Sequence, residues 1–253
     1  MRFASLGSGS RGNALLVESG NTRLLVDAGF GPREMSRRLE RLGLLPTDID
    51  AVLVTHEHSD HVGGVFACAR KYDWSVHLTH GTLAACRHAR EEVRVAVFDS
   101  HEALAIDGIR VLPFPVPHDA REPVQFVFDD GASRLGVLTD AGHVTSHMVS
   151  VLGVCDALVL ECNHDAVMLA EGSYPQALKN RIGGRWGHLD NAAAAALLSR
   201  LNHARLRHIV AAHLSEENNR PDLARGALSA ALGCEQSWIG VATQEDGFSW
   251  REL

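Results

Sequence analysis

The sequence lacks paired cysteines, long hydrophobic runs and an excess of basic charge. Its five cysteines are scattered and include no CxxC pair: Cys68, Cys86, Cys155, Cys162 and Cys234. This odd, unspaced set is typical of reduced thiols and excludes a disulfide framework. No apolar run approaches the roughly 18 residues of a membrane span, and the first residues lack a signal-peptide core. We therefore expect a cytoplasmic protein with no membrane partner.

The charge balance and the even composition limit the protein further. The chain has 24 Lys and Arg against 31 Asp and Glu, for a net charge of -7. This balance disfavours a protein that coats nucleic acid non-specifically, although a local basic groove is compatible with it. No linker, low-complexity tract or charge block divides the 253 residues. We predict one domain over residues 1–253, and the sequence leaves the oligomeric state open.

Two familiar catalytic motifs are also missing. The glycine-rich segment from Gly7 to Gly12 lacks the Gly-Lys-Ser/Thr of a P-loop, so no nucleotide cofactor is expected. The serines of this segment have no Ser/His/Asp context, which disfavours a serine hydrolase. The segment instead predicts a tight hairpin turn that brings Ser10 and Asn13 near the functional site.

Short apolar stretches and helical patterns alternate along the chain. Strands are predicted at 2–6, 14–18, 24–26, 51–54, 76–78, 93–98, 109–114, 124–128, 135–139, 157–161 and 206–212. Helices are predicted from Pro32 to Leu42 and at 65–72, 81–89, 191–201 and 221–232. Because strand clusters mixed with helices recur in both halves, the pattern predicts an α/β protein with two sheets back to back and helices outside.

The heptapeptide Thr-His-Glu-His-Ser-Asp-His at residues 55–61 is the most informative segment. It follows a predicted buried strand and offers four candidate metal ligands: His56, His58, Asp60 and His61. The two histidines separated by one residue can share one cation, and the later Asp and His can serve a second. Imidazole nitrogen and carboxylate oxygen suit Zn, Mn or Fe. A solvated polar turn is the alternative, and the specific spacing argues against it.

Four more polar residues end other predicted apolar runs: Asp27, His118, Asp140 and His213. Each alone is more typical of a surface loop or a helix cap than of a ligand. Their joint occurrence with the heptapeptide favours one shared site, because a layered fold gathers functional groups at strand ends.

With these residues in this order, the chain resembles the metallo-β-lactamase superfamily over nearly its whole length. The resemblance implies a four-layer αββα sandwich of two mixed sheets flanked by helices. It also implies two divalent metal ions, with zinc favoured and manganese or iron as alternatives. One ion would bind His56, His58 and His118, the other Asp60, His61 and His213, with Asp140 bridging and Asp27 orienting the ligand turn.

Further segments resemble the YycJ/WalJ branch of the superfamily, which is associated with exonuclease activity on DNA. These segments are residues 6–13, 161–164, 187–191 and 213–219. Asp190 departs from the pattern, in which we expect Ser, and adds negative charge near a presumed substrate-binding histidine. Only residues 141–212 separate Asp140 from His213, too few for the β-CASP domain inserted there in RNA-processing relatives.

The residues imply a hydrolase in which a metal-bridging hydroxide is the nucleophile, oriented by Asp60 and Asp140. His188 is the first candidate for a general acid or phosphate contact, and His164 is the second. Lys179, Arg181 and Arg185 precede His188 and form either a basic rim for a phosphate backbone or a solvated helix end. Asn191 completes the candidate substrate contacts.

The leading interpretation is a phosphodiesterase that acts on nucleic acid, specifically a DNA exonuclease. A thioester or lactone hydrolase similar to glyoxalase II is the alternative, because a fold does not dictate its substrate. A metal-stabilised binding module would need closed coordination, whereas seven ligands over two ions leave room for water.

Overall fold

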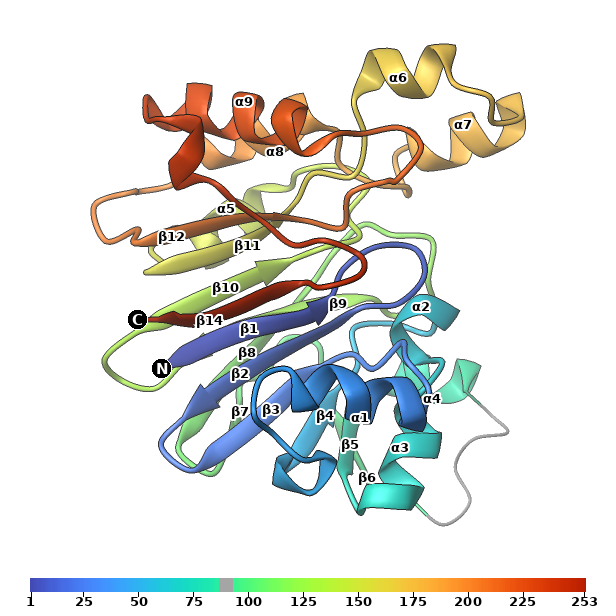
Figure 1. Cartoon of the computed structure of the whole chain (residues 1–253), viewed down its shortest axis with the longest axis vertical. Coiled ribbons are helices and arrows are strands. Elements are labelled where there is room, and N and C mark those ends of the chain that lie inside the picture. The colour runs from blue at the N-terminus through green and yellow to red at the C-terminus, as the bar shows by residue number, and fades with distance from the viewer. Residues whose placement is uncertain (87–92) are drawn as a thin grey trace.

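Two seven-stranded sheets lie face to face in the computed structural model, which describes residues 1–86 and 93–253 (Figure 1). Helices cover the outer face of each sheet, so the architecture is the predicted four-layer αββα sandwich. Among the described residues, no helix has the length and apolar character needed to cross a membrane.

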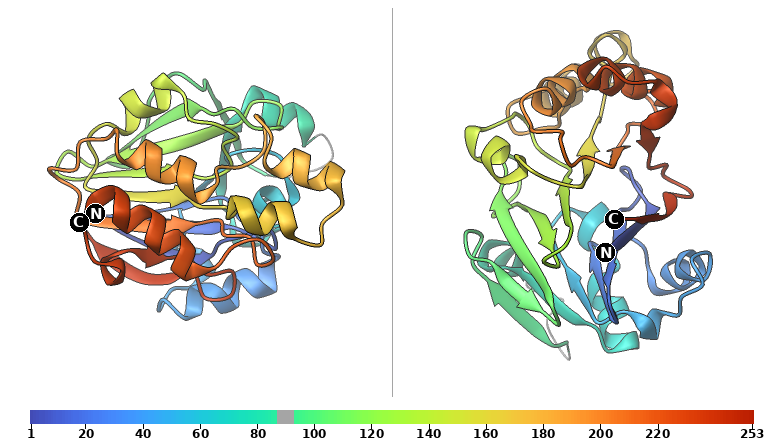
Figure 2. Two further views of the ribbon diagram at one scale, coloured as in Figure 1. Left: turned by 90° about the horizontal axis from the view of Figure 1, so that it is seen from above. Right: turned by 90° about the vertical axis from the view of Figure 1, so that its left-hand side faces the viewer.

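The first sheet joins an antiparallel half to a parallel half. Its strands, in spatial order, are β14 (Phe248–Glu252), β1 (Arg2–Gly7), β2 (Ala14–Ser19), β3 (Thr22–Val26), β4 (Ala51–Leu53), β5 (Ser75–Thr79) and β6 (Val95–Phe98). Pairing is antiparallel from β14 to β3 and parallel from β3 to β6. The pairing of β1 with β14 places the two chain termini side by side (Figure 2).

The second sheet repeats this plan. Its strands, in spatial order, are β7 (Leu104–Ile106), β8 (Ile109–Pro115), β9 (Val124–Asp129), β10 (Arg134–Leu138), β11 (Ala157–Glu161), β12 (His208–Ala212) and β13 (Gly240–Val241). Pairing is antiparallel from β7 to β10 and parallel from β10 to β13. Both sheets are therefore mixed.

Helices bring the chain back between parallel strands. The first half has α1 (Pro32–Glu40), α2 (Ser59–Val62), α3 (Val65–Tyr72), α4 (His80–Ala85) and the short 3-10 helix η1 (Pro46–Asp48). The second half has α5 (Ser146–Leu152), α6 (Ala166–Glu171), α7 (Gln176–Ile182), α8 (Asn191–Leu198), α9 (Pro221–Leu232) and the 3-10 helix η2 (Gln236–Trp238). Helices α6 and α7 stand at one end of the molecule (Figure 1). Pro32 and Pro221 each occupy a first helical turn, where a missing N–H costs nothing.

Three apolar clusters fill the three interfaces between the four layers. Alternation along a strand divides its side chains between them, since successive residues point to opposite faces. In β3, Leu24 and Val26 pack between the sheets and Leu25 packs toward α1 and α3. In β11, Val159 packs between the sheets, whereas Leu158 faces the cluster beneath α5, α8 and α9. This two-sided burial explains why the strands read as continuous apolar runs.

The structure corrects several predicted boundaries. The helix predicted through Leu42 ends at Glu40, and Gly43 follows with a left-handed backbone (φ 74°). The helix predicted at 81–89 begins at His80 and ends at Ala85, and residues 87–89 of that prediction lie outside the described residues. The helix predicted at 191–201 ends at Leu198, and the strand predicted from Leu206 begins at His208 because a turn occupies the residues before it.

Other elements were not predicted. These are β7, β13, β14, the helices α2, α5, α6 and α7, and the two 3-10 helices. Residues 141–212 consequently hold four helices together with β11 and β12.

Candidate metal centre and active site

The candidate ligands lie where strands of both sheets end. Asp27 follows β3, residues 54–61 follow β4, His118 lies beyond β8, Asp140 lies beyond β10 and His213 follows β12. Asp27, Asp140 and His213 each adopt a left-handed backbone, with φ of 63°, 55° and 55°. This sharp change of direction at the strand end turns each side chain toward the shared centre.

Asp27 holds the heptapeptide in place. Its Oδ1 accepts a hydrogen bond from the Thr55 amide (2.8 Å), and its Oδ2 accepts one from Thr55 Oγ1 (2.8 Å). The same Oδ2 lies 2.7 Å from His61 Nδ1, which leaves His61 Nε2 directed toward Asp140 Oδ2 at 3.3 Å. A carboxylate that fixes the ring of a ligand histidine is a common support of metal sites, and this geometry suits the orienting role expected for Asp27.

Three histidines converge in a first group. His58 Nδ1 lies 3.0 Å from His56 Nε2 and 3.2 Å from His118 Nε2. In His56 and His118, the other ring nitrogen contacts a neighbouring oxygen that fixes the ring. His56 Nδ1 lies 2.9 Å from Thr55 Oγ1, and His118 Nδ1 lies 2.9 Å from the Gly187 carbonyl. The three inward nitrogens lie within 4.8 Å of one another, an arrangement that can hold one cation.

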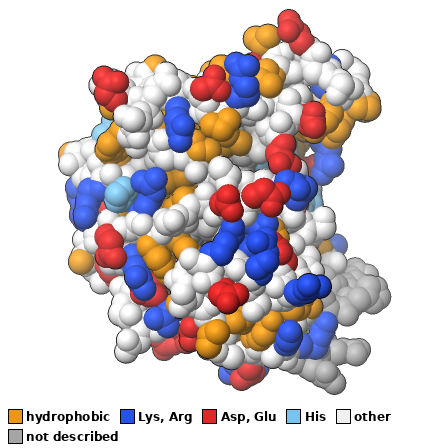
Figure 3. Space-filling model, in the orientation of Figure 1, with side chains coloured by type: hydrophobic (Ala, Val, Ile, Leu, Met, Phe, Trp, Pro, Cys, Tyr) orange, Lys and Arg blue, Asp and Glu red, His pale blue; other side chains and the backbone are white. Residues whose placement is uncertain are grey.

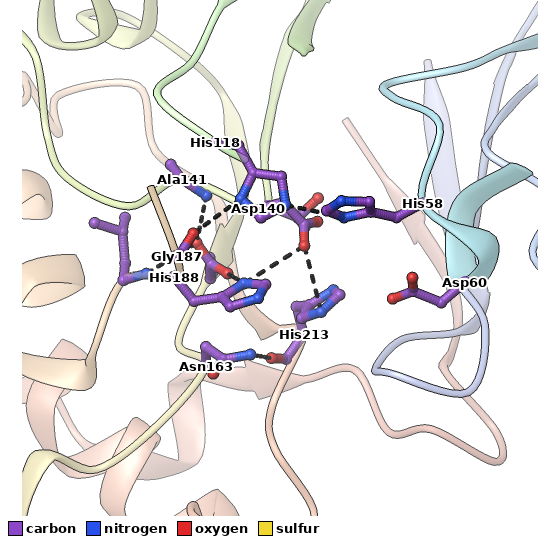
Figure 4. A network of polar contacts seen from close by, with 12 residues as sticks. His58, Asp60, His118, Asp140, Ala141, Asn163, Gly187, His188 and His213 are labelled. Carbon is purple, nitrogen blue, oxygen red and sulfur yellow. Dashed lines mark hydrogen bonds and ion pairs between the residues drawn. The ribbon is translucent and has the colours of Figure 1, made fainter. Parts of the chain in front are cut away.

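Asp60, His61 and His213 form a second group, again with ligand atoms within 4.8 Å of one another. Asp140 lies between the two groups: its Oδ2 is 3.3 Å from His61 Nε2 and its Oδ1 is 3.4 Å from His213 Nε2. It also falls within 4.8 Å of His56 and of His118. Figure 4 shows His58, Asp60, His118 and His213 arranged around this carboxylate.

Burial and neighbouring charges set the protonation of these side chains. Burial lowers the pKa of His56 well below its usual value, and nearby His61 lowers it further. Burial likewise lowers the pKa of His58. Burial alone would lower the pKa of His61 too, but Asp140 and Asp27 raise it well above the usual value. Since neutral imidazole is the form that binds metal, His61 must lose a proton when a cation binds.

Unsatisfied polar atoms at the centre fit a bound cation. Asp140 Oδ2 and His213 Nδ1 are buried with no hydrogen-bond partner among the described residues. Burial alone would raise the pKa of Asp140, but His213 and His61 hold it well below its usual value, so the carboxylate is ionised. Because a buried charge needs a partner, and because the donors are imidazole nitrogen and carboxylate oxygen, this set fits Zn, Mn or Fe.

His188 lies beside the centre and contacts the buried carboxylate of Glu161. Its Nδ1 is 2.8 Å from Glu161 Oε1 and 3.5 Å from Asp140 Oδ1. Burial alone would lower the pKa of His188, but the hydrogen bond and charge of Glu161 raise it to about 9. Glu161 also accepts hydrogen bonds from the amides of Ala141 (2.9 Å) and Leu189 (3.2 Å), so one carboxylate fixes both segments that carry Asp140 and His188.

A cavity of about 400 Å³ opens over the two ligand groups. Besides the candidate ligands, its walls include Ser10, Asn163, Tyr174, Leu178, Arg181 and His188. Asp119 lies at its edge, 3.4 Å from His118 Nε2 and 3.6 Å from His58 Nε2, and accepts a hydrogen bond from Arg181 Nε (2.6 Å). The sequence interpretation missed Asp119, Tyr174 and Leu178, although Asp119 is the neighbour of a predicted ligand.

The other predicted substrate contacts fall into two classes. Asn13 lies at the centre, with Nδ2 3.2 Å from His61 Nε2, and Ser10 lines the cavity. His164, Arg185 and Asn191 do not line it. His164 is buried with Nδ1 3.3 Å from Asn163 Oδ1, and Arg185 is exposed.

Asn191, Lys179 of the predicted basic rim and Asp190 have structural contacts instead. The Asn191 side-chain amide exchanges two hydrogen bonds of 2.9 Å with Asn219. Lys179 Nζ donates to the Ala170 carbonyl (2.7 Å), and Asp190 Oδ1 accepts from the Ala193 amide (2.7 Å) as the N-cap of α8. Asp190 therefore places its negative charge at the N-terminus of α8, where the helix dipole stabilises an anion.

Comparisons with known proteins agree with this geometry. A family model described as the Beta-lactamase superfamily domain matches residues 22–213. The exodeoxyribonuclease YycJ of Bacillus anthracis is 36% identical over 244 residues, which cover 95% of this chain and 92% of that protein. The exodeoxyribonuclease WalJ of Streptococcus pneumoniae is 33% identical over 245 residues, which cover 95% of this chain and 91% of that protein.

Solved structures share the fold at lower identity. The metallo-β-lactamase fold protein YhfI of Bacillus subtilis superposes with a TM-score of 0.77 at 17% identity, covering 100% of this chain and 99% of that one. Zn²⁺-bound PqqB of Methylobacterium extorquens superposes with a TM-score of 0.74 at 20% identity, covering 100% of both chains. The matched family model, the two mixed sheets and the clustered His and Asp side chains together show that the chain belongs to the metallo-β-lactamase superfamily.

Proposed function

We propose that this protein is a dinuclear metal-dependent phosphodiesterase that acts as a DNA exonuclease. The observation that carries the proposal is the pair of ligand groups sharing Asp140 at the floor of one cavity. Relatives named as exodeoxyribonucleases match 95% of the chain at 33–36% identity, which supports DNA as the substrate.

In this proposal, the residues divide between two ions. His56, His58 and His118 would hold one, Asp60, His61 and His213 the other, and Asp140 would bridge them, with zinc favoured and manganese or iron also compatible. Bound divalent ions would lower the pKa of a water molecule and offset negative charge on the phosphodiester.

Two side chains of the cavity would handle protons. Burial alone would raise the pKa of Asp60, but the hydrogen bond and charge of His61 and the charge of His213 lower it. A bound cation would take the place of the His61 proton and keep Asp60 ionised, so that it can accept a hydrogen bond from the attacking water. His188 has its Nδ1 held by Glu161, which leaves Nε2 to donate a proton to the leaving oxygen.

The alternative is hydrolysis of a thioester or lactone on the same fold. The moderately acidic net charge of -7 favours it over a phosphate substrate. On the face seen in Figure 3, positive and negative side chains are interspersed, so that face offers no broad basic track for a nucleic acid.

A chelate-and-reload assay tests the proposal. The chelated protein, reloaded with Zn²⁺ or Mn²⁺, should shorten a labelled DNA strand from one end. His58→Ala and Asp60→Ala should each reduce the rate by 100-fold or more, whereas the exposed His80→Ala should leave it unchanged. Failure to cleave DNA, RNA or bis(p-nitrophenyl) phosphate, combined with turnover of glutathione thioesters, would replace the proposal by its alternative.

A further inference from the structure

Helix α7 does not bury an apolar face against the core. Among the described residues it is the one α-helix with no buried side chain. An amphipathic helix on a protein surface normally buries its apolar stripe against the core. The apolar side chains of α7 instead face the cavity over the candidate metal centre.

The apolar wall, defined as Tyr174, Leu178 and Ile182, is formed by this helix and the residues just before it. Leu178 and Ile182 are spaced by four within α7, so they lie one above the other on a single face, and Tyr174 lines the same cavity from the segment that precedes the helix. Each is half-buried and lines the cavity. The other residues that line the cavity are mostly polar and include His58, Asp60 and further candidate ligands, which we call its ligand-bearing side.

We propose that the apolar wall packs against the base of a single unpaired terminal nucleotide whose phosphodiester lies on the ligand-bearing side. Strand ends would then enter the site one unstacked nucleotide at a time. This inference rests on the proposed exonuclease function and specifies the form of DNA that the site accepts.

The size of the cavity favours one nucleotide. Its volume of about 400 Å³ lies near the lower end of the roughly 300–1,000 Å³ typical of small-molecule sites. In a cavity of this size we expect the terminal nucleotide to enter alone, unpaired from its partner strand. Enzymes that bind one nucleotide this way stack its base on aromatic or apolar side chains.

The charge of the cavity also favours a short contact. Arg181 is the one Lys or Arg side chain among its lining residues, and Asp119 holds its guanidinium at 2.6 Å beside the apolar wall. Proteins that track a duplex neutralise many phosphates and show a steep salt dependence. A single arginine beside a single aromatic side chain suits one nucleotide.

A binding experiment tests the wall without turnover. The metal-loaded protein is titrated with single-stranded oligonucleotides that carry 2-aminopurine at either end and hydrolysis-resistant phosphorothioates at their terminal linkages. Stacking on Tyr174 should quench the fluorescence of one terminal probe. Tyr174→Ala should abolish the quench and weaken binding about 10-fold, in the range of a base–aromatic stack, whereas Tyr174→Phe should keep both. Trp238→Ala, which removes an exposed aromatic residue outside the cavity, is the matched control.

A cleavage experiment then separates this inference from the proposed function. With metal-loaded protein, a duplex with one unpaired terminal nucleotide should be cut faster than a blunt duplex ending in a G·C pair. An abasic terminal residue should slow the wild type about as much as Tyr174→Ala does, and combining the two should add no further loss. Cleavage of DNA that is indifferent to the terminal base, to pairing and to Tyr174 would overturn the inference alone. If the protein hydrolyses thioesters and does not cleave DNA, the proposed function is wrong. If the apolar wall binds a short acyl thioester and neither probe is quenched, both the proposed function and this inference are wrong.

Discussion

At the scale of single residues, the backbone at the centre is held in an unusual conformation. Asp27, Asp140 and His213 have positive φ, which side-chain-bearing residues rarely adopt and which costs on the order of 1–3 kcal/mol. Glycine would relieve this strain, but it would also remove the functional side chain. The sequence shows the polar residue at each strand end and does not show the turn that directs it inward.

His188 leads to the first prediction. Replacing His188 by Ala should slow DNA cleavage by about 100-fold or more, because the leaving oxygen loses its proton donor. The loss should be much smaller for bis(p-nitrophenyl) phosphate, whose leaving group departs as an anion. Steady-state kcat on both substrates is the measurement, and the exposed His80→Ala is the control. Equal losses on both substrates would mean that His188 positions the phosphate rather than protonating the leaving group.

Asp130 gives a pH-dependent prediction. It accepts hydrogen bonds from Ser19 Oγ (2.8 Å) and the Ser133 amide (2.8 Å), and so joins the end of β2 to the β9–β10 turn. Burial alone would raise the pKa of Asp130, but these hydrogen bonds lower it to about 2. Because the folded pKa lies below the unfolded value of about 3.9, the carboxylate stabilises the fold above about pH 4, and this contribution is lost as the pH falls toward 2.

Asp130→Asn should therefore lower the free energy of unfolding by about 1–2 kcal/mol at pH 7. The difference from wild type should shrink as the pH drops from 4 to 2. Urea denaturation across this range measures it, with the exposed Asp222→Asn as control. A difference that stays constant with pH would show that the amide disrupts packing and that the charge has no role.

At the scale of elements, helix α1 is fixed to the sheet by a buried arginine. Arg38 Nη1 donates to the carbonyls of Leu6 (2.6 Å), Gln244 (3.1 Å) and Glu245 (2.7 Å). Its guanidinium also lies over the Phe30 ring at 3.9 Å. One side chain thereby joins α1, the end of β1 and the loop before β14.

Arg38→Met should destabilise the protein by about 2–3 kcal/mol, since buried carbonyls would lose a charged donor. Arg37→Met is the matched control: both arginines pair with Glu34, but Arg37 is exposed, so its loss should change stability by no more than about 0.5 kcal/mol. Chemical denaturation of both variants tests this. Similar effects for both would place the stabilisation in the ion pair with Glu34 and not in the buried carbonyl contacts.

The elements that the sequence predicts are those with two buried faces or a strong apolar stripe. Helix α9 was predicted with its observed bounds, Pro221–Leu232, because its stripe and first-turn proline agree. Strand β13 has two residues and β7 has three, too short for a periodic pattern. Helix α7 buries nothing, so its stripe has no core to match, and the contribution of Tyr174 to the cavity could not be read from spacing.

The residues of the candidate site also differ in how far the sequence predicts them. Histidine and aspartate at strand ends are visible in the sequence because the residue types and their spacing are specific. Glu161 is placed last in a continuous apolar strand and reads as its terminus, yet it is fully buried and holds His188. The Asp119–Arg181 pair joins residues far apart in the chain, and only the fold brings them together.

At the scale of the whole molecule, the candidate centre joins the two sheets. His56, His58 and Asp60 follow a strand of the first sheet, whereas Asp140 and His213 follow strands of the second. A cation held by both sets binds only when the sheets are packed together. Metal binding should therefore stabilise the entire fold and not one loop.

Reloading the chelated protein with Zn²⁺ at about 100 times its dissociation constant should add about 2.7 kcal/mol of stability. For a chain of this length, that corresponds to a rise in Tm of roughly 5–10 °C. Differential scanning calorimetry measures the shift, and Asp140→Asn should reduce it because both proposed ions would lose a ligand. Unchanged Tm on reloading would argue against a centre that spans the sheets.

The spread of the candidate ligands along the chain has a consequence for synthesis. The set begins at His56 and is completed by His213, near the end of the second sheet. A polypeptide still emerging from the ribosome therefore carries an incomplete set until most of its length has been translated. The candidate centre can therefore assemble only late in translation, once both sheets have their ligand-bearing strands.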